Sequence, residues 1–146
     1  MTRKPLLLIS ACLCGQVCRY DAVKLEFPYF ASLAASGVAL PICPEIQGGL
    51  PTPRPPFELV KRLALTRAGA DVTEACKLGA CKVLETAMRH NIRVAILKDR
   101  SPSCGTTRIF DGSFSGRLIP GMGLLAEILR QNDFTLYSEH NAPEYF

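Results

Sequence analysis

Pro5-Leu6-Leu7-Leu8-Ile9-Ser10-Ala11-Cys12 is the stretch of sequence that decides the fold. Its apolar run is continuous rather than alternating, which is typical of a strand buried on both faces of a parallel sheet. Similar runs cover residues 38–42 and 92–98, and each of the three runs is followed by a cysteine: Cys12, Cys43 and Cys104. Ligands of open parallel sheets bind at the carboxyl ends of the strands. We therefore expect the three thiols to meet there and to hold a metal or cluster with one open coordination position.

The rest of the chain alternates between helical and strand patterns. Helices are expected over residues 30–36, 71–90 and 121–131, and a last strand over residues 134–137. This order predicts an α/β protein of the three-layer α/β/α type, Rossmann-like, with a mainly parallel open sheet.

Two further segments contain turn-forming residues. Residues 44–56 contain five prolines, which excludes a helix or a central strand and predicts a rigid loop. Asp111-Gly112 lies between residues 108–110 and Ser113-Phe114, an arrangement that indicates a short hairpin.

The composition is that of a single globular domain covering residues 1–146, with 48% hydrophobic and 21% charged residues. The net charge of +4 does not by itself imply nucleic-acid binding. Apolar runs of about five to seven residues are far shorter than the roughly 18 that a membrane span needs, so no membrane partner is expected. The start of the chain loosely resembles a signal peptide, but its short apolar run leads directly into the cysteine loop, which favours a buried strand. We expect a cytoplasmic location.

The chain has seven cysteines, an odd number that does not suit a framework of disulfides. Reduced thiols, some structural and some bound to a metal, are the better interpretation. Cys76 lies on the apolar face of the helix over 71–90 and is expected in the core, whereas Cys81 lies on its polar face. Cys14 and Cys18 either pack under the first loop or add ligands from it, and spacing alone leaves both interpretations open.

The longer motifs resemble those of the thiouracil desulfidase family across nearly the whole chain. They are Ser10-Ala11-Cys12-Leu13 with Gly15 and Arg19-Tyr20-Asp21, Cys43-Pro44-Glu45 with Gly48-Gly49-Leu50 and Pro53-Arg54-Pro55-Pro56, Asp71-Val72-Thr73, Arg100-Ser101-Pro102-Ser103-Cys104-Gly105, and Asp111-Gly112 with Phe114-Ser115-Gly116. Two positions depart from the family pattern: Ala22 stands where glycine is usual, and Cys14 where an aliphatic residue is common.

The resemblance implies a [4Fe–4S] cluster whose fourth iron binds the sulfur of a thiolated pyrimidine. The cluster ligands carried over are Cys12, Cys43 and Cys104. The acid/base glutamate and the serine used near the cluster correspond to Glu45 and Ser101. Further candidates for substrate contact are Asp21, Ser103 and Arg54, although Asp21 could instead hold its neighbours in place and Arg54 could pin its loop to Glu58.

Other functions remain open at this point. The same three cysteines, completed by water or Cys14, could bind zinc in a structural or binding protein. A thiol redox protein is disfavoured because the chain has no Cys-x-x-Cys motif. A desulfidase could also act on 4-thiouridine in tRNA rather than on a free nucleobase, with Lys61, Arg62 and Arg67 as a basic patch.

Overall fold

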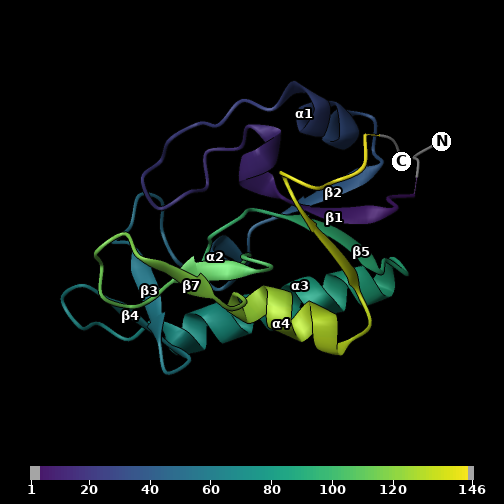
Figure 1. Ribbon diagram of the computed structural model, residues 1–146. Helices are drawn as coiled ribbons and strands as arrows, with labels where there is room; N and C mark the ends of the chain where they lie inside the picture. Colours follow the sequence, from purple (N-terminus) through teal and green to yellow (C-terminus); the bar gives the residue numbers. More distant parts are fainter. Residues whose placement is uncertain (1–3, 145–146) are drawn as a thin grey trace.

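The structure, a computed structural model, describes residues 4–144 and is built around a four-stranded sheet (Figure 1). The strands lie in the order β2-β1-β5-β8, and every neighbouring pair is parallel. Their bounds are Leu7–Ser10 for β1, Ala39–Ile42 for β2, Val94–Leu97 for β5 and Thr135–Ser138 for β8. The predicted parallel open sheet is confirmed.

Strand β1 lies at the centre because both of its faces are apolar. Leu7, Leu8 and Ile9 are completely buried. Leu8 packs into a core shared with α3 and α4, whereas Leu7 and Ile9 point to the opposite face and pack with residues of α1. A continuous apolar run therefore contributes to two cores, one on each side of the sheet.

Helices cover both faces of the sheet and complete the three layers (Figure 1). Helix α1 (Pro28–Ala35) lies on one side, and α3 (Thr73–Arg89) and α4 (Leu124–Gln131) lie on the other. Asp71 accepts a hydrogen bond from the Thr73 backbone N–H at 2.9 Å, so it satisfies an amide of the first turn of α3. Within residues 4–144, no helix has both the length and the apolar character that crossing a membrane requires.

The expectation of a helix-free loop over residues 44–56 is wrong at its start. Pro44–Gln47 forms a one-turn helix, α2. Proline at the first helical position costs no hydrogen bond, because the N–H that it lacks would have no partner inside the helix. The other four prolines of this segment lie outside helices and strands, as predicted: Pro51, Pro53, Pro55 and Pro56.

Two small antiparallel hairpins form two-stranded sheets separate from the central sheet. The first pairs β3 (Phe57–Val60) with β4 (Leu63–Thr66) and was not predicted. The second pairs β6 (Arg108–Phe110) with β7 (Leu118–Pro120). The predicted hairpin is present, but the expected short turn at Asp111-Gly112 is wrong. These two residues begin a longer loop over residues 111–117, and the second strand starts only at Leu118.

Helices α2 and α3 touch through glycines, and this contact fixes the segment that follows Cys43. A Cβ built on Gly79 would lie 1.7 Å from the Pro44 carbonyl oxygen, and one built on Gly48 would lie 1.9 Å from that of Ala75. Both distances are far inside van der Waals contact. Only glycine allows the two backbones to approach this closely.

Gly79→Ala is expected to destabilise the protein by about 3 kcal/mol or more, since the added methyl must push α2 away from α3. Helix propensity alone would predict the opposite sign, a gain of about 1 kcal/mol. Urea unfolding measures the difference. Leu78→Ala, on the exposed side of the same helix, is the control and should change the free energy of unfolding by about 0.5 kcal/mol or less.

Candidate functional site

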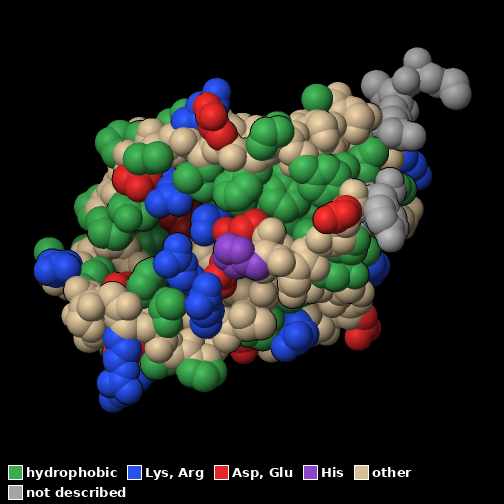
Figure 2. All heavy atoms as spheres, turned by 45° about the horizontal axis from the view of Figure 1, so that its top comes forward, with side chains coloured by type: hydrophobic (Ala, Val, Ile, Leu, Met, Phe, Trp, Pro, Cys, Tyr) green, Lys and Arg blue, Asp and Glu red, His purple; other side chains and the backbone are tan. Residues whose placement is uncertain are grey.

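A cavity of about 410 Å³ opens at the carboxyl ends of β1, β2 and β5. Its walls come from the segments that follow these strands and from the two hairpins. Figure 2 shows a hollow on one face of the molecule with Lys and Arg side chains gathered around it. This is the place at which open parallel sheets bind their ligands.

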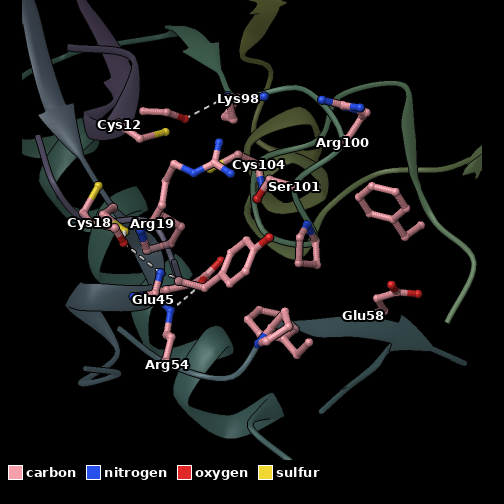
Figure 3. Close-up of a pocket in the computed structure, with 18 of the residues that line it drawn as sticks. Cys12, Cys18, Arg19, Glu45, Arg54, Glu58, Lys98, Arg100, Ser101 and Cys104 are labelled. Atoms are coloured by element: carbon pink, nitrogen blue, oxygen red, sulfur yellow. Dashed lines mark hydrogen bonds and ion pairs between the residues drawn. The ribbon is translucent and has the colours of Figure 1, made fainter. Parts of the chain in front are cut away.

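The cysteines predicted to meet all line this cavity. Cys12 lies in the short 3₁₀ helix η1 (Ala11–Cys14) directly after β1, Cys43 lies between β2 and α2, and Cys104 lies in the loop after β5. Cys18 lines the same cavity, while Cys14 points away from it and donates its S–H to the Phe30 carbonyl at 3.6 Å. The cavity thus holds four thiols (Figure 3).

Burial and crowding raise the pKa values of these thiols. Burial raises the pKa of Cys104 to about 12, and a hydrogen bond with Cys18 together with burial raises that of Cys43. The pKa of Cys18 rises to about 11, mainly through its hydrogen bond with Cys12. The raised pKa values favour the protonated thiols, so a metal that binds the cysteines must displace protons.

Glu45 is held in the cavity wall by Arg54. Arg54 donates its Nε and Nη2 to Glu45 Oε1 at 2.9 and 2.7 Å. Its remaining N–H groups bind the Pro51 carbonyl at 2.9 Å, the Thr52 hydroxyl at 3.1 Å and the Cys18 carbonyl at 2.9 Å. All three nitrogens of the guanidinium are thus engaged, through four hydrogen bonds and the ion pair with Glu45.

This geometry corrects one of the two expectations for Arg54. Arg54 lines the cavity, but only 5% of its side chain is exposed and its nitrogens already bind protein groups, so a contact with substrate stays a prediction. Its partner is Glu45 rather than Glu58, whose carboxylate accepts the backbone N–H groups of Gly112 and Phe114. Arg54 therefore orients Glu45 and ties the segment after η1 to the proline-rich loop.

Arg54→Met is expected to lower the free energy of unfolding by about 3–5 kcal/mol, because it leaves the half-buried Glu45 carboxylate without its counter-charge. The matched control is Arg62→Met, which removes an exposed pair with Glu127 and should cost about 1 kcal/mol or less. Urea unfolding of both variants measures the contrast. Equal costs would show that the buried pair stabilises the fold no more than the exposed one does.

Ser101 and Ser103 have different positions despite their spacing. Ser101 lines the cavity, and its Oγ accepts the backbone N–H groups of Ser103 at 3.1 Å and Cys104 at 3.0 Å. Because both acceptor positions are filled, the Ser101 hydroxyl can act only as a donor, and the Cys104 side chain is one partner within its reach. Ser103 is buried, is absent from the cavity lining and donates to Glu45 Oε2 at 2.9 Å. It supports Glu45 and does not face a ligand.

Asp21 also lies outside the cavity lining. It accepts both Nε and Nη2 of Arg19 at 3.1 Å and the backbone N–H of Val23 at 3.1 Å. Arg19 and Tyr20 do line the cavity, so Asp21 fixes its neighbours, which was the alternative interpretation of this residue. Ala22, at the position where glycine is usual, has a φ of 57°, in the left-handed region that glycine favours.

The wall opposite the thiols was missed in the sequence. It is formed by aromatic side chains of the two hairpins and their loop: Phe57, Phe110 and Phe114. Three apolar rings beside polar groups give the cavity the mixed character of a small-molecule site. The aromatic residues flanking Asp111-Gly112 were the available signal, but only the pairing of β6 with β7 shows where they lie.

The basic residues considered as a patch are separated in the structure. Arg67 lines the cavity, where it donates to the Phe114 carbonyl at 3.2 Å and packs over its ring. Arg62 instead pairs with Glu127 and with the Met122 carbonyl. Arg100 also lines the cavity and is exposed.

Comparison with known proteins gives concordant matches. A family model described as 2-thiouracil desulfurase matches residues 7–141. An uncharacterized protein of Bacillus subtilis (strain 168), YbbK, is 37% identical over 145 residues, which covers 92% of this chain and 96% of that protein. The solved structure of a [4Fe-4S]-dependent thiouracil desulfidase, TudS, superposes with a TM-score of 0.91 at 41% identity, over 97% of this chain and 95% of that one.

Proposed function

The chain belongs to the 2-thiouracil desulfurase family, and we propose that it binds a [4Fe–4S] cluster and removes sulfur from thiolated pyrimidines. Cys12, Cys43 and Cys104 are the proposed ligands, and Glu45 and Ser101 the proposed catalytic residues. The observation that carries the proposal is that these side chains, from segments far apart in the sequence, line one cavity. The solved desulfidase structure supports it.

The donor set suits a cluster better than a single ion. Among residues 4–144, no group of three or more His, Cys, Asp or Glu side chains is arranged to hold one metal ion. A cubane makes a different demand, since each cysteine bonds to a separate iron atom and the thiols need only surround the cluster. Thiols that line one cavity from separate segments are compatible with this requirement, and with the match to a [4Fe-4S]-dependent enzyme this favours the cluster over the zinc alternative.

When bound, the cluster supplies a soft, Lewis-acidic iron for the thiocarbonyl sulfur of the substrate. Glu45, oriented by Arg54 and Ser103, accepts a proton from the water that adds to the ring carbon. Ser101 donates its hydroxyl proton in a hydrogen bond to the reacting group and relays a proton. The water oxygen stays on the ring as a carbonyl, and both of its protons leave with the sulfur as H₂S, so that atoms and charges balance.

The rest of the cavity suits a flat, small substrate. A pyrimidine ring in the cavity can pack against the faces and edges of four aromatic side chains: Phe57, Phe110, Phe114 and Tyr20. A volume of about 410 Å³ is within the range of small-molecule sites. We infer a free thiolated nucleobase as substrate, in a cytoplasm that keeps thiols reduced.

Anaerobic purification followed by iron and sulfide analysis tests the cofactor, and release of sulfide from 2-thiouracil and 4-thiouracil tests the reaction. We expect about four iron and four sulfide per chain and sulfide release from at least one of the two bases. A colourless protein with stoichiometric zinc would overturn the proposal. Sulfide release only from 4-thiouridine in intact tRNA would overturn the choice of substrate.

A further inference from the structure

Cys18 is a fourth thiol in the cavity that the proposed function leaves unused. It is buried and lines the cavity together with Cys12 and Cys43, and its side chain interacts with those of both residues. The Cys43 S–H donates to the Cys18 carbonyl at 4.0 Å. Figure 3 shows its sulfur directed toward the cavity, on the same side as that of Cys12. Cys18 is therefore in contact with two of the three proposed ligands while not being one of them.

The backbone holds Cys18 in this position. Its N–H donates to the Gln16 carbonyl at 3.1 Å, and the Gln16 N–H donates to the Ala11 carbonyl at 3.2 Å, which ties the segment to η1. Its own carbonyl accepts Arg54 Nη2 at 2.9 Å. The Cys18 thiol is thus fixed next to Cys12 by the local turn and next to Cys43 by the proline-rich loop.

We propose that Cys18 is a positioning residue whose S–H donates a hydrogen bond to the sulfur of Cys12 or Cys43 when these bind the cluster. The inference rests on the proposed function and concerns how this chain tunes its cofactor. Ionised ligand sulfurs in a half-buried cavity need donors, and a neutral thiol in contact with both of them is such a donor. A fourth cysteine ligand would close the iron position that the proposed reaction needs for the substrate sulfur, which favours the donor role over a ligand role.

A hydrogen bond to a ligand sulfur stabilises negative charge on the cluster. Because the reduced cluster carries more negative charge than the oxidised one, the bond stabilises the reduced state more. Donors of this kind are among the factors that set cluster potentials. Removing the Cys18 donor should therefore make the reduction potential more negative. The number of iron atoms bound should not change, because the three ligands remain.

The experiment compares reduction potentials of the reconstituted protein, followed by EPR, in Cys18→Ala and Cys18→Ser, with iron and sulfide content measured on the same samples. We expect a full cluster in both variants, a more negative potential for Cys18→Ala, and a smaller shift for Cys18→Ser, whose hydroxyl still donates. Cys18→Val, which also lacks a donor but fills the space, should shift in the same direction as Cys18→Ala. Cys14→Ala is the matched control, because Cys14 belongs to the same segment but binds Phe30 instead, and its potential should equal that of the wild type.

Two results would overturn the inference: an unchanged potential in Cys18→Ala and Cys18→Val, or a loss of iron from both, which would make Cys18 a ligand. Neither outcome would affect the proposed cofactor and reaction, provided the wild type carries a cluster and releases sulfide. The second outcome would revise only the proposed ligand set. A wild-type protein without a cluster would reject the proposed function itself and, with it, this inference.

Discussion

Cys104→Ala is expected to abolish the cluster and all sulfide release. Cys104 is the only proposed ligand supplied from the β5 side of the cavity, because Cys12 and Cys43 follow β1 and β2. Cys18 cannot replace it, since its thiol is already in contact with the other two. With two ligands left, a cubane has no third attachment, so iron and sulfide per chain should fall to background and turnover should be undetectable.

The fold should survive this substitution. Cys104 belongs to a core shared by β1, α3 and α4, and loss of one buried heavy atom costs about 1 kcal/mol. Far-UV circular dichroism and urea unfolding separate cluster loss from unfolding. Cys81→Ala, which removes an exposed thiol, is the control and should keep both cluster and activity. A Cys104→Ala protein with a full complement of iron would reject the proposed ligand set.

The central sheet was predictable because its signal is local. Each of β1, β2 and β5 is a continuous apolar run, and parallel strands buried on both faces allow little else. The position of the cysteines after these runs then predicted that their side chains would share one cavity. Local pattern and known sheet geometry were sufficient for this part.

The elements that were predicted wrongly depend on contacts distant in sequence. Pro44–Gln47 is helical although it begins a proline-rich segment, because its first position tolerates proline and Gly79 allows α3 to approach. The β3–β4 hairpin has no strong turn signal: its connecting residues Lys61 and Arg62 have φ values of 52° and 66°, a conformation that glycine or asparagine would have indicated. No local rule identifies such a turn.

The support of Glu45 could not be predicted either. Arg54 is flanked by prolines, which gave it the appearance of a free cation on a loop, and only the folded chain shows that all three of its nitrogens bind protein groups. Ser103 lies two residues after Ser101, yet one binds Glu45 and the other faces the cavity. Hydrogen-bond partners of this kind follow from the tertiary structure and leave no periodic pattern in the sequence.

Glu45→Gln is expected to lower kcat by about 10²- to 10⁴-fold, the usual contribution of a positioned acid/base group, while iron and sulfide content stay at the wild-type level. Glutamine keeps the shape of the side chain: its carbonyl oxygen can still accept from Arg54, and its amide can donate to the Ser103 hydroxyl, which can reverse its direction. The substitution therefore removes the proton acceptor with little change in structure.

Ser103→Ala is the matched comparison, because it removes one hydrogen bond from Glu45 Oε2 and leaves the carboxylate in place. One such bond is worth about 0.5–1.5 kcal/mol, so kcat should fall by roughly tenfold or less. A large loss in Glu45→Gln beside a small one in Ser103→Ala, at equal cluster content, separates proton transfer from positioning. Wild-type turnover in Glu45→Gln would remove Glu45 from the chemistry. Ser101 would then be the remaining candidate for moving a proton, because its oxygen already accepts two backbone N–H groups and its hydroxyl can only donate.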